Sequence, residues 1–327
     1  MKKFMMSCLI TAVVLFFVGV ALFVPACAKG TGDLSDVLDG VTDLAKNVDN
    51  LDQIGDKIGE GVQNFVDKIE NEGAFNIEAS DISIQFDTNF PVYENQEKIE
   101  KTLIEGQAVK IATEVGGCSL KFETSDDGMI YMEASNVEKL QTYVQDGTLM
   151  IRGKKTKFTN ISDSQSMKVT VYLPAGQTYE NMNLDLGAGA LDLNAVSADQ
   201  VKIDVGAGSF TATGLQANDL DINVGMGAVK LKEMQAGKME ASVGMGAFNF
   251  DGTLLGDGKF ECAMGSIDGV LNGDEKDFNY DVSGAMGEVK VGTTGAKGLA
   301  KDWKQDNGSN KTITLECSMG SAKISFK

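Results

Sequence analysis

Histidine is absent from this 327-residue chain, and arginine occurs once, at Arg152. Without histidine, the chain cannot build a Ser-His-Asp triad, an imidazole general base or one of the common zinc sites. A single arginine also nearly excludes binding sites that clamp carboxylates or phosphates between guanidinium groups. We therefore predict no catalytic residues and expect that the protein is not an enzyme.

Positive charge is scarce as well, because 29 Lys and Arg residues stand against 47 Asp and Glu residues. The net charge of -18 and the pI near 4.4 argue against nucleic acid as a partner, since phosphates require a basic surface. The 38 glycines form no Walker or dinucleotide fingerprint, because they recur at a regular period instead of once between a strand and a helix. We predict no cofactor.

An uncharged apolar run does exist, from Phe4 to Ala28. This run is long enough to cross about 30 Å of hydrocarbon as a helix, at about 1.5 Å per residue. Lys2 and Lys3 precede it and an acidic segment follows, so the positive-inside rule places the amino terminus in the cytoplasm. We predict that residues 1–28 form a single-pass membrane anchor or signal segment, with the carboxy-terminal domain extracellular.

Two alternatives to a retained anchor remain open. Ala26-Cys27-Ala28 has the small-x-small form of a signal-peptidase site, and Cys27 is a candidate for lipidation. Pro25 makes a poor lipobox, and the apolar run is longer than the apolar core region of a typical signal peptide, which favours retention. All three alternatives place the remainder of the chain outside the cytoplasm.

Residues 29–75 form an acidic linker with apolar residues at heptad spacing. The two heptad positions hold Leu34, Val41, Val48, Gly55, Val62 and Ile69, and Val37, Leu44, Leu51, Ile58 and Phe65. This pattern predicts an amphipathic helix or coiled-coil stalk with possible self-association, although the glycines within it weaken a helix. Because the polar face is acidic, a stalk or a helix lying on the next domain is favoured over a helix on an anionic membrane surface.

A glycine-centred repeat organises residues 182–326. Its central residues are Ala188, Ala207, Met226, Met245, Met264, Met286 and Met319, and the first four steps are 19 residues each. The stretch VGGCSLKF at 115–122, centred on Gly117, is a related upstream copy. Apolar residues alternate with polar residues on both sides of each centre, which is typical of strands with one buried face.

Each repeat therefore contains two strands and two turns. One such unit cannot bury its apolar face alone, whereas stacked units align like residues about 4.8 Å apart and form a continuous core. The sequence predicts an all-β fold, a parallel β-solenoid with rungs of about 19 residues, over residues 76–327. We expect the glycines to supply positive φ at the corners, and the central Ala or Met to close the edge of the core.

Two departures from the repeat are predicted to be loops. Three extra residues separate Met264 from Met286, and an insertion at 297–310 carries Trp303, the only tryptophan. Trp303 could anchor a partner or cap the open end of the solenoid, and capping is favoured because terminal repeats need it. Upstream, residues 76–183 show alternating strands with possible hairpins, and residues 136–147 fit a short helix or a strand equally well.

The strand order VKIATEVGGCSLKF, QDGTLMIRGK and MKVTVYLPAGQTYENMNLDLGAGALDL, followed by glycine-centred rungs, resembles the bacterial putative-adhesin family of β-strand-repeat domains. The resemblance covers most of residues 77–327. It implies a β-solenoid outside the cell membrane, often behind an amino-terminal membrane helix, with no catalytic motif. This sequence departs from the family in carrying Met at the centre of five rungs.

Two sets of side chains recur at the same position of each repeat and could form metal sites. In both cases a structural explanation is favoured over metal binding. An outward column of Asp185, Asp204, Asn223, Glu261 and Glu316 could collect calcium, but a solvated charged face is the usual meaning of such a column. The five central methionines could bind copper(I), but packing at the core edge is the favoured interpretation. We predict no metal-ligating residues.

Cys262 and Cys317 occupy an inward column, where cysteine acts as a small hydrophobe. With the Met286 rung between them, they are expected to lie about 9.6 Å apart, too far for a disulfide.

Two functions of different classes fit these features. The protein is either an adhesin-like binding or structural module that contacts envelope polymers or surface proteins, or the sensing domain of an envelope-stress system that works through a membrane partner. The first is the favoured prediction.

Overall fold

The computed structural model describes residues 77–78, 84–158 and 166–327. The predicted membrane segment at 1–28 and the predicted stalk at 29–75 lie outside these residues. Within the described ranges, no helix combines the length and the hydropathy needed to cross a membrane.

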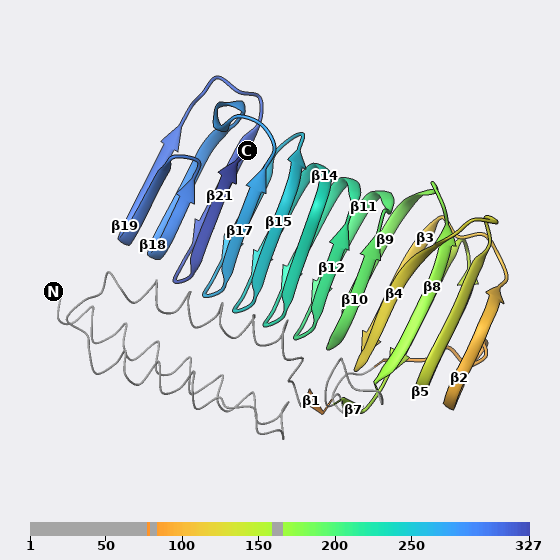
Figure 1. Ribbon diagram of the computed structural model, residues 1–327. Coiled ribbons are helices and arrows are strands. Elements are labelled where there is room, and N and C mark those ends of the chain that lie inside the picture. The colour runs from red at the N-terminus through yellow and green to blue at the C-terminus, as the bar shows by residue number, and fades with distance from the viewer. Residues whose placement is uncertain (1–76, 79–83, 159–165) are drawn as a thin grey trace.

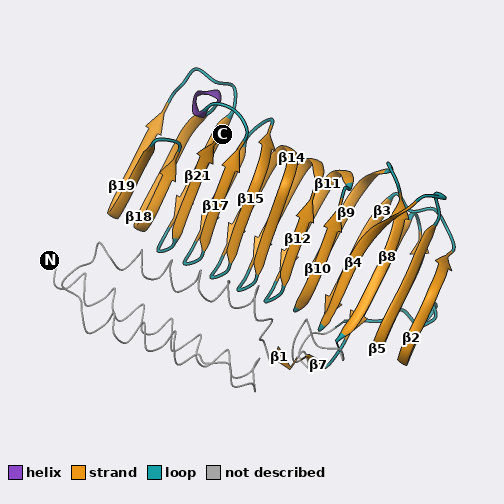
Figure 2. Cartoon of the chain, viewed as in Figure 1, coloured by secondary structure: helices purple, strands orange, loops and turns teal. Residues whose placement is uncertain are grey.

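The described part of the chain is built almost entirely from strands (Figure 2). The first nine are β1 (Ile77–Glu78), β2 (Tyr93–Ile104), β3 (Lys110–Gly116), β4 (Cys118–Ser125), β5 (Ile130–Gln145), β6 (Thr148–Lys154), β7 (Lys157–Phe158), β8 (Met167–Pro174) and β9 (Thr178–Leu186). The next eight are β10 (Gly189–Asn194), β11 (Ser197–Val205), β12 (Ser209–Thr213), β13 (Gln216–Val224), β14 (Ala228–Val243), β15 (Ala247–Leu254), β16 (Gly258–Cys262) and β17 (Ser266–Leu271). The last are the 3-10 turn η3 (Glu275–Asp277), β18 (Asn279–Val291), β19 (Thr294–Gln305), β20 (Thr312–Cys317) and β21 (Ser321–Phe326).

These strands stack into an elongated solenoid with two faces (Figure 1). The first face runs through β6, β3, β9, β11, β13, the second part of β14, and β16. The second face runs through β8, β4, β10, β12, the first part of β14, β15 and β17. All of these pairings are parallel, as the repeat predicts.

The 19-residue register is confirmed by the strand pairing. In the inward column, Leu186, Val205, Val224 and Val243 lie opposite one another in successive rungs, and each is at most 3 % exposed. The upstream copy also joins the stack, because the Gly117 amide donates to the Ala188 carbonyl at 2.9 Å. Like residues therefore form one continuous apolar core along the molecule.

The amino-terminal end is closed by antiparallel strands. β5 pairs with β2, with β6 and with β8 in antiparallel fashion, and Asp146 and Gly147 both have positive φ in the β5–β6 hairpin turn. Residues 136–147, where a helix and a strand fitted equally well, are strand up to Gln145. β2 forms the outer edge of the sheet and carries several Lys and Glu side chains, which disfavour pairing with the edge of another sheet.

The reason predicted for the corner glycines is wrong for most rungs. Gly117 and Gly189 have positive φ, but Gly225 and Gly227 do not. A Cβ atom on Gly227 would instead overlap the carbonyl oxygen of Gly208 in the preceding rung. Glycine is needed because neighbouring backbones approach closely at the corner, and positive φ is not the common cause.

The order of the last rungs also differs from the order in the sequence. β20 and β21 insert between β16–β17 and β18, so Cys262 lies directly opposite Cys317. The predicted separation of about 9.6 Å is therefore wrong, because directly paired strands are about 4.8 Å apart. The cause is β19, which pairs with β18 in antiparallel fashion and occupies its outer edge. Only the inner edge of β18 remains open to β20 and β21.

The insertion that was predicted to form a loop is mostly strand. β19 covers the end of the stack, and Trp303 lies opposite Val282 and packs against the core. Cys317 of the inserted rung and Cys262 of its neighbour are free thiols, as is Cys118. Trp303 is thus a cap on the solenoid, as the favoured alternative predicted.

Candidate functional site

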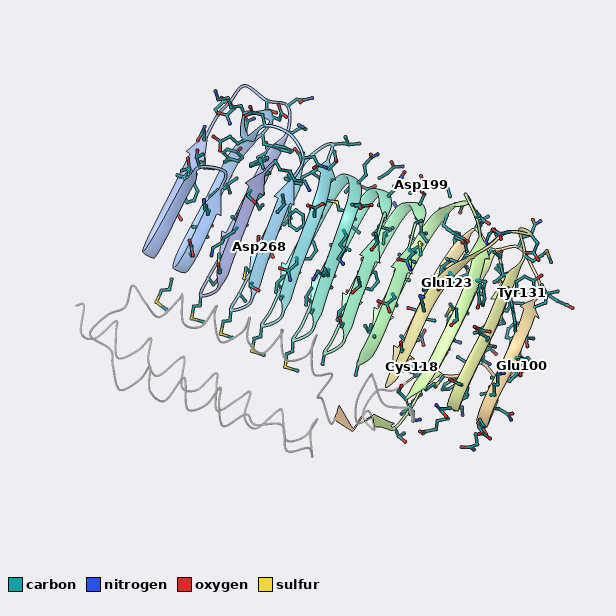
Figure 3. All side chains as sticks on the ribbon, viewed as in Figure 1. Glu100, Cys118, Glu123, Tyr131, Asp199 and Asp268 are labelled. Carbon is teal, nitrogen blue, oxygen red and sulfur yellow. The ribbon has the colours of Figure 1, made fainter. Side chains whose placement is uncertain are left out.

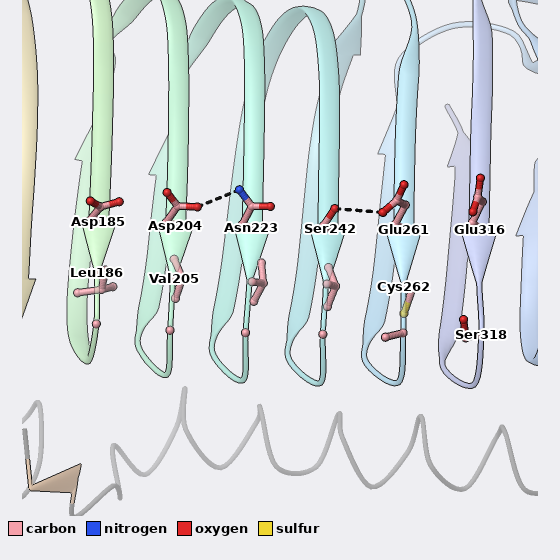
Figure 4. Close-up of a pocket in the computed structure, with 17 residues that line it drawn as sticks. Asp185, Leu186, Asp204, Val205, Asn223, Ser242, Glu261, Cys262, Glu316 and Ser318 are labelled. Carbon is pink, nitrogen blue, oxygen red and sulfur yellow. Dashed lines mark hydrogen bonds between the residues drawn. The ribbon is translucent and has the colours of Figure 1, made fainter. Parts of the chain in front are cut away.

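A ladder of polar side chains runs along the first face, one from each rung (Figure 4). Its members, in spatial order, are Glu114, Asp185, Asp204, Asn223, Ser242, Glu261, Glu316 and Ser283. The outward column predicted from the sequence is therefore assembled in space. The inserted rung makes Glu316 the direct neighbour of Glu261, which the sequence order did not suggest.

Hydrogen bonds join neighbouring members of this polar ladder. Asn223 Nδ2 donates to Asp204 Oδ1 at 2.9 Å, and Ser242 Oγ donates to Glu261 Oε2 at 3.5 Å. At the first rung, Arg152 Nε donates to Glu114 Oε2 at 3.2 Å, so the only arginine sits at one end of the ladder. The ladder is thus a linked polar surface rather than a row of isolated charges.

A groove of about 790 Å³ follows the ladder. Six rungs contribute to it, each with its ladder side chain and neighbouring corner residues, and four of the lining side chains are carboxylates: Asp185, Asp204, Glu261 and Glu316. The lining includes no lysine or arginine. Its repeating geometry suits an extended ligand that contacts several rungs at once.

The two aspartates at the start of the groove share a hydrogen bond and titrate differently. Burial, followed by the hydrogen bond with Asp204 and that residue's negative charge, raises the pKa of Asp185. Burial also acts to raise the pKa of Asp204, but hydrogen bonds from Lys202 and Asn223 outweigh it and lower that pKa. Asp204 therefore carries the charge of the pair more readily than Asp185.

Lysines two residues before the ladder positions were not singled out from the sequence. Lys202 Nζ lies 2.7 Å from Asp204 Oδ2, and Lys259 Nζ lies 2.5 Å from Glu261 Oε1. The sequence could have predicted these ion pairs, because residues i and i+2 of a strand share one face. They partly neutralise the ladder and favour the solvated charged face over a calcium site.

The calcium alternative gains no support from the side-chain positions. Within the described ranges, no three or more acidic or cysteine side chains are grouped closely enough to hold a metal ion. Asp268 and Asp199, labelled in Figure 3, lie on other outward positions of the stack.

The central methionines occupy five consecutive rungs along one corner of the solenoid. Each backbone amide donates to the preceding rung, from Met226 to Gly206 and finally from Met286 to Ser318, both at 2.7 Å. Met264 is 6 % exposed and the other four are half-buried. Met264 is buried as the prediction requires, whereas none of the other four belongs to the core cluster or packs against it, so the prediction is wrong for those four.

The comparisons with known proteins assign the family. The signature described as Toastrack DUF4097 matches residues 108–256 and residues 178–325, which together span more than half of the chain. The chain belongs to the Toastrack DUF4097 family. This is a family of β-strand repeats, in agreement with the resemblance found in the sequence. No curated protein sequence matches the chain.

Solved structures that match this Toastrack protein have low sequence identity to it. A putative adhesin from Bacteroides fragilis is 16 % identical, with 75 % of this chain and 100 % of that chain covered and a TM-score of 0.37. A putative lipid binding protein from Parabacteroides distasonis is 15 % identical, with coverages of 69 % and 96 % and a TM-score of 0.45. A putative adhesin from Parabacteroides merdae is 13 % identical, with coverages of 72 % and 98 % and a TM-score of 0.39.

Proposed function

We propose that this Toastrack protein is a membrane-tethered, extracellular binding or structural module of the cell envelope, without enzymatic activity. The observation that carries the proposal is the polar ladder with its groove, which presents one polar side chain at each of six rungs. A surface that repeats every 4.8 Å or so matches an extended polymer or a long protein edge better than a small substrate. Envelope polymers and other surface proteins are the partners that we propose.

The amino-terminal sequence supports the tether. The uncharged run from Phe4 to Ala28 has the length of a membrane helix, and Lys2 and Lys3 favour a cytoplasmic amino terminus. In this arrangement the solenoid stands on the outer side of the membrane. A cleaved or lipidated amino terminus would leave the solenoid on the same side.

Site-specific photo-cross-linking in intact cells tests the binding face. A photoreactive residue replaces Asn223 in the groove, and a matched variant carries it at Asn249, a half-buried asparagine on the second face. We expect cross-links to an envelope polymer or surface protein from position 223 and few or none from position 249. Equal cross-linking from both positions, or none from either, would contradict the proposed face. A single membrane protein as the only product would favour the alternative of a sensing domain.

A further inference from the structure

The five methionines at the corner of the solenoid form a row that neither the core nor the polar ladder uses. In spatial order the methionine row is Met226, Met245, Met264, Met319 and Met286. Four intervals of about 4.8 Å give the row a length of about 19 Å. The inserted carboxy-terminal rung keeps it unbroken, because the Met319 amide donates to Ala263 and the Met286 amide donates to Ser318.

The shared feature of this row is sulfur rather than apolar bulk. The same corner position is Ala188 and Ala207 in the two preceding rungs, so the fold does not require a large side chain there. Four of the methionines are half-buried and lie outside the core cluster, and only Met264 is buried, so core packing does not explain the row as a whole. A position with these properties tolerates any aliphatic side chain, yet every member of the row is a thioether.

The spacing of the row matches soft-metal coordination. A metal–sulfur bond of about 2.3 Å, the value for zinc thiolates, places two sulfurs on opposite sides of one ion about 4.6 Å apart. That distance is close to the rung spacing of about 4.8 Å. Three rotatable bonds in each methionine allow a third sulfur to approach from the next rung. Thioethers are soft ligands that select copper(I) among the biological metals.

We propose that the methionine row is a copper(I)-binding site, in which neighbouring rungs supply two or three thioether sulfurs to each ion. Binding involves no electron transfer and releases no proton, because the ion enters as copper(I) and thioethers are neutral. This site is separate from the polar ladder, so the copper(I) proposal does not depend on the proposed binding function.

The buried thiols of the same rungs are the competing soft ligands. Cys262 and Cys317 are 3 % and 4 % exposed, so an ion reaches them only if the corner opens. The hydrogen bond with Cys317, together with burial, raises the pKa of the Cys262 thiol, which keeps its proton. The thioethers of the half-buried methionines are therefore the more accessible sulfur atoms. The experiment distinguishes binding by the methionines from binding by the cysteines.

The test uses the full chain labelled at the methionine methyl groups with carbon-13. The protein is titrated with silver(I), a stable stand-in for copper(I), and the methyl resonances are followed by NMR. Each row methyl is assigned by its own Met→Leu variant. Met182 and Met239, both 0 % exposed in the core, serve as internal controls for folding and for nonspecific effects.

We expect the row resonances to shift while those of Met182 and Met239 stay in place. Replacing Met245, Met264 and Met319 together by leucine should lower copper(I) affinity at least tenfold, measured anaerobically against a chromogenic chelator. Met239→Leu should leave that affinity unchanged. Retention of the core methyl pattern shows that the triple variant is folded.

Two results would overturn the proposal. The row resonances do not move at saturating silver(I), or the triple variant binds copper(I) as tightly as the unchanged protein, which would assign binding to the cysteines. If the row resonances do not move and the row methyls are also protected from a soluble paramagnetic agent, the row is covered by another segment or protein and serves as a docking surface.

Discussion

At the scale of single residues, the two positions that flank each central residue have different steric requirements. The position before the centre is Ala263, Ala285 or Ser318 in three rungs, so a side chain is accepted there. The position after the centre is glycine in all seven regular rungs. The reason is steric, because a Cβ on Gly227 would overlap the Gly208 carbonyl oxygen, whereas a Cβ on Gly225 would lie 2.9 Å from the Gly206 oxygen.

Replacing each glycine by alanine tests this difference. Gly227→Ala must push two rungs apart, so we expect it to lower the free energy of unfolding by about 2–4 kcal/mol. Gly225→Ala makes a milder overlap with the Gly206 backbone oxygen and should cost less, about 1–2 kcal/mol. Urea denaturation followed by circular dichroism measures both. Equal costs for the two variants would contradict the steric explanation.

Asp185 provides a pH-dependent prediction. Its side chain is exposed on one side, but partial desolvation, the hydrogen bond with Asp204 and that residue's negative charge raise its pKa, so the folded state holds this proton more tightly than the unfolded chain. The stability that Asp185 contributes is therefore present below the ordinary Asp value of 3.8 and is lost as the pH rises through the raised pKa. Asn is neutral throughout, so Asp185→Asn should raise the Tm at pH 7 by about 1–3 °C.

Scanning calorimetry at several pH values measures this effect. The difference between Asp185→Asn and the unchanged protein should disappear below pH 3.8. Asp268→Asn, which removes an exposed carboxylate from the second face, is the control. A Tm that falls at pH 7 on replacing Asp185 by Asn would contradict the assigned direction of the pKa shift.

At the scale of elements, β19 decides how the solenoid ends. It turns back along β18 and places Trp303 against the core, which shields the last rung from solvent. The Trp303 Nε1 atom is buried, and no hydrogen-bond partner for it is found in the described part of the chain. Ring packing rather than the indole N–H therefore supplies the stabilisation by Trp303.

Two substitutions at Trp303 separate packing from hydrogen bonding. Trp303→Ala removes the ring and should lower the free energy of unfolding by about 2–3 kcal/mol, at the low end for such changes because the side chain is half-buried. Trp303→Phe keeps a ring and removes the unpartnered N–H, so it should cost less than about 1.5 kcal/mol. Circular dichroism during denaturation measures both. Equal losses in the two variants would show that the N–H has a partner.

At the scale of the whole molecule, the predicted orientation can be tested with two tags. An epitope tag after Lys327 should be cut away by protease added to intact cells whose outer wall has been removed. A tag placed before Met1 should stay protected until the cells are lysed. The reverse pattern would contradict the orientation derived from Lys2 and Lys3.

Much of the architecture followed from the sequence. The 19-residue period predicted the inward columns, the two strands of each rung and the outward polar column, since each depends only on alternation within a rung and on stacking of like residues. The central methionines were assigned to the core edge because the same position is alanine in two rungs and methionine readily fills irregular gaps. Whether a corner side chain points into the core depends on the path of the backbone at the turn, which composition does not specify.

The order of the rungs was decided only in three dimensions. Every rung offers the same hydrogen-bonding edges and similar apolar columns, so the repeat by itself does not determine which rung stacks on which. Chain order suggested that the Met286 rung follows the Met264 rung directly. The antiparallel return of β19 occupies one edge of β18, and the carboxy-terminal strands fill the remaining edge. That arrangement brought Cys262 beside Cys317 and Glu261 beside Glu316, because edge availability and not sequence order selected the neighbours.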